Sequence, residues 1–187
     1  MQRTLAYLIA VMVSMALTAC GSFSKIGTAP PVGVDGVACV GTVADSLAQA
    51  IDTTDTASLN EARAASGKGG VCAGKAFVVQ QPIKVYRVFD SSRSSSAFGR
   101  WWSLDKPAGA KEKYRQDFAI CNAWSALDRL TSCEIKPGST LVIGTTQSVV
   151  CEEGTYPKSA NLQVYLQNDA PANKLVVENC RDEGAWP

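Results

Sequence analysis

The sequence predicts an α+β fold with a mostly antiparallel sheet, and three observations lead to this prediction. Runs rich in β-branched and aromatic residues fill most of the second half of the 187-residue chain. Helical patterns precede these runs and interrupt them once, instead of alternating with them as a parallel sheet requires. The chain has seven cysteines, a number typical of exported domains stapled by disulfides. We therefore expect a short N-terminal helical arm, a long central helix and a disulfide-stapled sheet.

The first nineteen residues are typical of an export signal. Arg3 supplies a positive charge, and residues 5–17 form an uncharged apolar run too short to span a bilayer. The sequence LTAC that ends at Cys20 resembles the lipobox of bacterial lipoproteins, which implies cleavage before Cys20 and lipidation of its thiol. Gly21 in place of Asp favours the outer membrane, facing the periplasm. The alternative is an ordinary signal peptide that happens to contain a cysteine.

The domain boundaries follow from a change in composition. Residues 21–36 are rich in Gly, Ser and Pro and carry no periodic apolar pattern, as in a flexible linker. We expect a signal peptide over residues 1–19, a lipidated cysteine and tether over 20–36, and one α+β domain over 37–187.

Three helices are predicted in the domain, over residues 43–51, 58–65 and 108–131. In the second, Ser58 is followed three residues later by Glu61, the spacing of a capping box. The third is the long central helix. Its apolar residues recur every three or four positions, at Tyr114, Phe118, Cys121, Trp124 and Leu127.

Six strands are predicted around that central helix. They cover residues 76–80, 83–89, 100–104, 139–150, 162–167 and 174–180. Pro82 and the Pro137-Gly138 pair mark turns between strands, and residues 152–160 are expected to form a loop.

The six cysteines that follow Cys20 indicate three disulfides. Six cysteines allow fifteen pairings, and the sequence does not select one. Our working hypothesis pairs neighbours along the chain: Cys39–Cys72, Cys121–Cys133 and Cys151–Cys180. A metal or redox site is the alternative, but the chain contains no CxxC pair and no histidine, so we expect no metal.

The composition also excludes several classes of function. With 18 Lys and Arg against 17 Asp and Glu, the formal net charge is +1 and there is no long basic run. The chain therefore lacks the charge with which nucleic-acid-binding proteins neutralise phosphates, and we expect no nucleic-acid partner. The absence of histidine excludes Ser-His-Asp and Cys-His catalysis.

Three strands carry residues suited to binding or chemistry. Arg87 shares a strand face with Val85, the face expected to be buried, so it needs a core carboxylate such as Asp117 or Asp128, or the anion of a ligand. Trp101 and Trp102 are adjacent, so one should enter the core and the other should face a cleft or solvent.

In the strand over residues 162–167, Gln163 and Tyr165 lie on the face opposite Leu162, Val164 and Leu166. Glu152 and Glu153, on the loop before that strand, are more typical of a solvated pair than of acid–base catalysts.

The order of four motifs resembles that of ADP-ribosyltransferase-like domains. They are VYRV at 85–88, FGRWWSL at 98–104, KPGSTLVIG at 136–144 and NLQVYL at 161–166. The resemblance is closest to bacterial NAD-glycohydrolase toxins of the tuberculosis-necrotizing-toxin kind, and it extends over about residues 76–168.

The resemblance implies roles for individual residues. Arg87 would hold the NAD pyrophosphate, Ser103 would support the nicotinamide ribose, and Gln163 would orient it, with Arg87 and Gln163 as the catalytic pair. NAD is then a substrate and there is no resident cofactor. The transferase glutamate is absent, which favours hydrolysis over transfer to protein. Trp101 or Trp102 would stack on a ring of the dinucleotide.

A second function remains open. The chain would then be a non-catalytic cell-envelope lipoprotein, tethered to the membrane by its lipid, whose domain binds a protein partner. The enzymatic interpretation requires Arg87, Ser103 and Gln163 to converge in one cleft, whereas the binding module predicts no such convergence.

Overall fold

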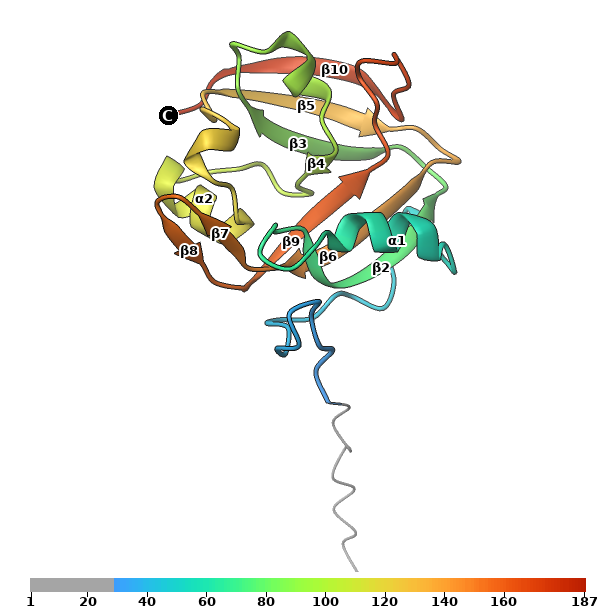
Figure 1. Ribbon diagram of the computed structural model, residues 1–187. Helices are drawn as coiled ribbons and strands as arrows, with labels where there is room; N and C mark the ends of the chain where they lie inside the picture. The colour runs from blue at the N-terminus through green and yellow to red at the C-terminus, as the bar shows by residue number, and fades with distance from the viewer. Residues whose placement is uncertain (1–28) are drawn as a thin grey trace, which may run out of the picture.

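Two antiparallel sheets form the body of the protein in the computed structural model, which describes residues 29–187 (Figure 1). The larger sheet has five strands in the order β1-β2-β6-β9-β4, and the smaller has three in the order β10-β5-β3. A separate hairpin, β7–β8, lies beside α2. The strands are β1 Ala50–Thr53, β2 Val71–Val79, β3 Ile83–Phe89, β4 Trp101–Trp102, β5 Arg129–Ile135, β6 Thr140–Thr146, β7 Val149–Cys151, β8 Gly154–Tyr156, β9 Ser159–Leu166 and β10 Val177–Ala185.

The core lies between the two sheets. Side chains alternate between the two faces of each strand, and the apolar ones on the facing sides of the sheets pack against each other. Phe77 of β2, Leu141 of β6 and Val164 of β9 pack there against Val85 of β3 and Ile135 of β5. Each such fully buried side chain contributes about 1.5–3 kcal/mol relative to an exposed one. On the other face of the five-stranded sheet, helix α1 (Thr56–Arg63) covers a smaller cluster that includes Tyr165. The expectation of a mostly antiparallel, disulfide-stapled fold is therefore confirmed.

The prediction of a long central helix over residues 108–131 is wrong. Helix α2 spans only Lys111–Phe118 and ends because Ala119 adopts the left-handed conformation, with φ 53° and ψ 53°. The apolar residues beyond it have separate partners. Cys121 forms a disulfide, Leu127 packs on Val88 and Trp186, and Trp124 is 45% exposed on a single 3-10 turn. The helical spacing of the apolar residues after Phe118 therefore occurs in a loop and not in a helix. That loop ends where β5 begins, at Arg129.

The N-terminal helical arm is also shorter than expected. Residues 43–51 form no helix, and β1 pairs with β2 from Ala50 onward. In α1 the N-cap is Asp55, whose carboxylate accepts hydrogen bonds from the backbone N–H and the hydroxyl of Ser58. Ser58 is therefore a first-turn residue and not the cap.

Most strand predictions hold, with changes at the ends. Residues 83–89 form β3 as predicted. The run 139–150 is two strands, β6 and β7, separated at Gln147 and Ser148, and the expected loop at 152–160 contains β8. The last strand, β10, begins at Val177 and continues to Ala185.

All six cysteines after Cys20 are paired, but only one pair is the expected one. Cys39–Cys72 is present, whereas the other two bonds join Cys121 to Cys151 and Cys133 to Cys180. The pairing is set by which strands are neighbours in the fold, and not by distance along the chain. Strands β5 and β10 are neighbours, and an irregularity in β10 between Glu178 and Arg181 brings the Cα of Cys180 to 4.0 Å from that of Cys133.

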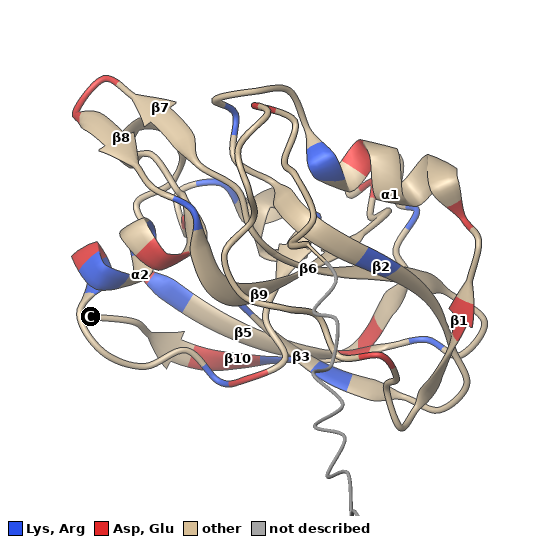
Figure 2. Cartoon of the chain, turned by 90° about the horizontal axis from the view of Figure 1, so that it is seen from below, with Lys and Arg blue, Asp and Glu red and all other residues tan. Residues whose placement is uncertain are grey.

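The chain upstream of β1 contacts the body before residue 37. Asp35, within the segment expected as a tether, forms an ion pair with Lys158. The predicted signal peptide and Cys20, the predicted site of lipidation, lie outside the described residues. Within residues 29–187 no helix has the length and hydropathy needed to cross a bilayer. Basic and acidic residues are interspersed along the chain, without a long run of either sign (Figure 2).

Candidate functional site

A cavity of about 360 Å³ opens where the two sheets meet the loop after α2. Its walls come from the C-terminal end of α1 and the turn after it, from β3, β4 and β9, and from residues 118–127. Three of the residues singled out in the sequence, Arg87, Trp101 and Gln163, line this cavity. Segments more than 70 residues apart in the chain therefore meet at one site.

Arg87 is a half-buried cation whose acceptors are main-chain carbonyls. Its Nε donates to the carbonyl of Ser96 at 2.7 Å and its Nη1 to that of Trp101 at 2.6 Å. The expected core carboxylates have other partners, since Asp117 pairs with Lys113 and Asp128 accepts from Ser91. The prediction of a carboxylate partner from that pair is wrong.

Burial lowers the pKa of Arg87 to about 10, because desolvation disfavours the charged form. The side chain is still a cation at neutral pH. Within residues 29–187 no carboxylate forms an ion pair with it, and its Nη2 has no hydrogen-bond acceptor. An anionic ligand in the cavity would supply the missing countercharge.

Gly99 makes room for this guanidinium. A Cβ at position 99 would lie 2.5 Å from Nη2 of Arg87 and 2.6 Å from its Cζ, closer than atoms can approach. The glycine of the FGRWWSL motif therefore has a steric role: any side chain there would displace Arg87 from its two carbonyl acceptors.

Gln163 is buried, and its amide orientation is fixed by a chain of hydrogen bonds. Nε2 donates to the carbonyl of Gly70 at 3.1 Å and to the hydroxyl of Thr146 at 3.0 Å. Thr146 donates its own proton to the carbonyl of Asn161, so it accepts from Gln163. Both amide protons are therefore used, and Oε1, which has no donor in the described part of the chain, is left to accept from a ligand.

The two tryptophans of β4 face opposite sides. Trp102 is 3% exposed, belongs to the core between the sheets, and donates its indole N–H to the carbonyl of Gly99 at 2.8 Å. Trp101 lines the cavity, with its ring centroid 5.0 Å from that of Tyr165. Only Trp101 is therefore placed to contact a ligand in this cavity.

Ser103 lies apart from the cavity. It is buried, and its hydroxyl contacts the carbonyls of Tyr86 and Asp105 at 3.3 and 2.9 Å. It borders a different hollow of about 410 Å³ lined by Lys106, Lys113 and Asp117. Arg87 and Gln163 thus converge in one cavity, and Ser103 does not join them.

Several lining residues were not predicted. Arg100 donates to the hydroxyl of Tyr165 at 3.3 Å, and that hydroxyl donates to the Glu61 carboxylate at 2.8 Å. Burial raises the pKa of Tyr165, and its hydrogen bond to Glu61 acts in the same direction. Lys68, on the turn after α1, adds another cation. Three cations and one carboxylate therefore line the cavity.

Trp124 is the second tryptophan of the cavity, at its exposed rim. The Cys121–Cys151 disulfide anchors its loop, and Nη2 of Arg93 donates to the Trp124 carbonyl at 2.6 Å. The sequence placed Trp124 on the apolar stripe of a helix, which concealed this role.

The same disulfide brings Cys121, Cys151 and Glu153 together, but sulfurs joined to each other are not thiolate ligands, so this cluster is no metal site.

Comparison of the chain with protein-family models, with curated proteins and with solved structures found no match.

Proposed function

We propose that this protein is an exported, lipid-anchored NAD-binding protein that slowly hydrolyses the nicotinamide–ribose bond in the cavity between Arg87 and Gln163. The observation that carries the proposal is Arg87 itself. A half-buried guanidinium without a carboxylate partner in the described chain shares one cavity with the ring of Trp101 and the free amide oxygen of Gln163. These are the groups that a pyrophosphate, a planar base and a ribose hydroxyl need.

The proposed chemistry is loss of nicotinamide followed by addition of water. The C–N bond breaks with its electron pair leaving on nicotinamide, and water adds to the ribose carbon and loses a proton. Arg87 holds phosphate oxygens, for which its planar donors are suited. Gln163 Oε1 accepts from a ribose hydroxyl. Glu61, the one carboxylate lining the cavity, is the group suited to stabilise developing positive charge.

The size of the cavity is consistent with part of a dinucleotide. Ligand pockets have volumes of about 300–1,000 Å³, and this one lies near the lower limit. In the proposed complex, one mononucleotide half would occupy the cavity and the second half would lie over the rim. There, Arg100, Lys68 and Trp124 are exposed and offer two cations and a ring.

A binding module without catalysis is the second candidate, and the position of Ser103 favours it. The resemblance implied that Ser103 supports the nicotinamide ribose, yet its hydroxyl contacts two main-chain carbonyls outside the cavity. In that case the cavity or its rim would bind a protein partner in the cell envelope.

Titration of the purified, oxidised protein with NAD tests the proposal, with tryptophan fluorescence and calorimetry as readouts. We expect Arg87→Lys to weaken binding about tenfold, because an ammonium group lacks the planar fork that donates to both carbonyls and still presents Nη2 to a phosphate. Arg181→Lys, an exposed arginine of β10, is the matched control and should bind as the parent does.

Nicotinamide release, followed by chromatography, tests catalysis separately. We expect slow release by the parent and loss of release in Glu61→Gln and Gln163→Ala. Absence of NAD binding at millimolar concentration would refute the proposal and leave the protein-binding module. Binding without release would restrict the function to recognition.

A further inference from the structure

The turn preceding β1 exposes an unusual number of apolar side chains. Val32, Val34, Val37 and Val40 are 63, 45, 59 and 47% exposed. They are four of the seven large apolar residues exposed within residues 29–187, and they fall within nine consecutive positions. We call residues 32–40 the valine turn.

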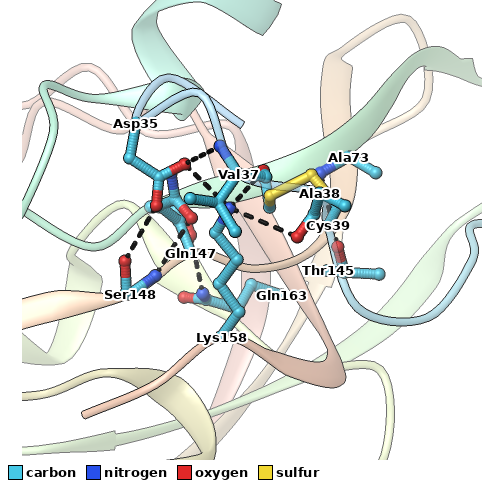
Figure 3. The surroundings of a disulfide bond; sticks show 12 residues. Asp35, Val37, Ala38, Cys39, Ala73, Thr145, Gln147, Ser148, Lys158 and Gln163 are labelled. Carbon is cyan, nitrogen blue, oxygen red and sulfur yellow. Dashed lines mark hydrogen bonds and ion pairs between the residues drawn. A yellow bond between two sulfur atoms is a disulfide. The ribbon is translucent and has the colours of Figure 1, made fainter. Parts of the chain in front are cut away.

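The backbone of the valine turn is fixed, so the valines cannot rotate inward. Val32 and Ala38 pair as an isolated bridge, Gly33 donates to the carbonyl of Val37 at 2.8 Å, and Cys39 donates to that of Pro31 at 2.8 Å. The Cys39–Cys72 disulfide then bonds the turn to β2 (Figure 3). The apolar side chains are therefore held at the surface by hydrogen bonds and a covalent bond.

The valine turn presents no free charge. Asp35 is the only ionisable side chain in residues 29–41, and its carboxylate points into the body, where Nζ of Lys158 lies 2.8 Å away (Figure 3). Lys158 also donates to the carbonyl of Val37 at 2.5 Å. What faces outward is an uncharged surface of valine side chains, which matches hydrocarbon better than charged headgroups or a polar protein surface.

The position of the turn in the chain indicates the occupant. Val32, the first residue of the valine turn, lies twelve positions after Cys20, and a chain of that length reaches at most about 40 Å when fully extended. If Cys20 is lipidated, as the proposed function assumes, the valine turn stays within that distance of the bilayer surface. The bilayer is therefore the apolar partner within reach of this surface.

We propose that the valine turn is a membrane-docking element that inserts its valines into the boundary between headgroups and acyl chains. It adds a second attachment to that of the lipid on Cys20 and fixes the orientation of the domain. Because the surface is apolar and uncharged, docking depends neither on anionic lipid nor on ionic strength.

Photocrosslinking to acyl chains tests this inference without depending on lipidation. The chain from residue 21 onward, with six histidines in place of Cys20, is attached to phosphatidylcholine vesicles that contain a nickel-chelating lipid and a diazirine phospholipid. Mass spectrometry then locates the crosslinks. We expect labelling of residues 32–40. It should fall about tenfold in Val34→Ser/Val37→Ser, because each change removes most of a valine's apolar contribution. Val150→Ser, equally exposed but on β7, should leave it unchanged.

The alternative outcomes each contradict the proposal. Labelling spread evenly over the surface, or labelling that appears only with phosphatidylglycerol and vanishes in salt, would overturn it. So would a concentration-dependent dimer that the double variant abolishes, since the valines would then contact a second copy. Circular dichroism of each variant establishes that it is folded. The intact mass of the native membrane-bound protein tests lipidation separately.

Discussion

Arg87 and Arg115 are enclosed by carbonyl oxygens instead of carboxylates. Arg115 is 6% exposed, and its guanidinium donates to the carbonyls of Cys121 at 3.3 Å, Ser125 at 2.8 Å and Ala126 at 3.4 Å. The planar, multiply donating guanidinium can serve three carbonyls at once, which a single ammonium group cannot. Arg115 thus holds the loop at the cavity, while Arg87 keeps Nη2 for a ligand.

We expect Arg115→Lys to destabilise the protein by about 2–3 kcal/mol, because at least two of these three carbonyls lose the donor that a single ammonium group cannot replace. Chemical denaturation measures this loss. Quenching of tryptophan fluorescence should also increase, because Trp124 becomes more accessible when its loop is held less tightly. Arg181→Lys, an exposed change on β10, is the control and should unfold at the parent's midpoint. A variant as stable as the parent would mean that the loop does not depend on Arg115.

The pH dependence of the valine turn follows from Asp35. The hydrogen bond from Lys158 lowers the pKa of Asp35 to about 2, from an ordinary value near 3.8. Since the carboxylate is charged in the folded state at lower pH than in the unfolded state, its contribution is complete above about pH 4. That contribution is lost as the pH falls from about 4 toward 2.

We therefore expect limited proteolysis with an acid protease to cut residues 32–38 faster at pH 2 than at pH 4. In Asp35→Asn, the cleavage at pH 4 should already be fast and should change little with pH. Equal protection of this variant at pH 4 would show that the disulfide and the backbone hydrogen bonds hold the turn without the Asp35 ion pair.

Among the elements, β2 and β6 are in close contact beside the site. At Gly144 of β6, a Cβ would lie 2.5 Å from the Cβ of Val71 and 2.6 Å from the carbonyl of Ala73. The register of β2 shifts between Val71 and Gly74, where the strand crosses this glycine. The shift directly follows Gly70, whose carbonyl accepts from Gln163, so the strand contact at Gly144 helps to position Gln163.

Gly144→Ala should therefore destabilise the protein by about 2–4 kcal/mol, since the backbone of β2 must move to admit a methyl group. It should also weaken NAD binding more than its effect on folding explains. Gly138→Ala is the control. That glycine has φ 84° but open space around it, so only the conformational cost of about 1 kcal/mol is expected. Thermal unfolding and the NAD titration measure both effects.

Elements set by local pattern were predictable, and those set by partners were not. Residues 83–89 form β3 as expected because alternating apolar residues between turn signals have one stable arrangement. In residues 108–131 the spacing is helical, yet a disulfide at Cys121 and the carbonyl acceptors of Arg115 stabilise a loop more. Strand alternation placed Arg87 on the buried face of its strand and Gln163 opposite Leu162, Val164 and Leu166. It also predicted that one of Trp101 and Trp102 would face a cleft or solvent, without selecting which. Glu61, Lys68 and Trp124 reach the cavity only through tertiary contacts.

At the scale of the whole molecule, two disulfides of similar span have different positions relative to the cavity. Cys121–Cys151 spans 30 residues and anchors the rim, while Cys133–Cys180 spans 47 residues and joins β5 to β10. By the entropy of the closed loop, each should contribute about 3–4 kcal/mol. Their effects on binding should differ because only the first borders the site.

We expect Cys121→Ala/Cys151→Ala and Cys133→Ala/Cys180→Ala to lose similar stability in denaturant titrations. Only the first pair should lose NAD affinity, since residues 118–127 would no longer be held against β7. Equal affinities for the two double variants would show that the rim is positioned without its disulfide. Each pair serves as the control for the other.

The order of the cysteines also bears on how the protein matures. The bonds Cys121–Cys151 and Cys133–Cys180 interleave along the chain. In the proposed export, Cys121 and Cys133 would therefore reach an oxidising compartment before either of their partners. A segment whose ends are twelve positions apart closes more readily than one whose ends are thirty positions apart. An oxidase acting during secretion would first join Cys121 to Cys133, and thiolate attack must then break that bond. If the protein is exported as proposed, we expect its biogenesis to depend on a disulfide isomerase, and cells that lack one should accumulate the Cys121–Cys133 form.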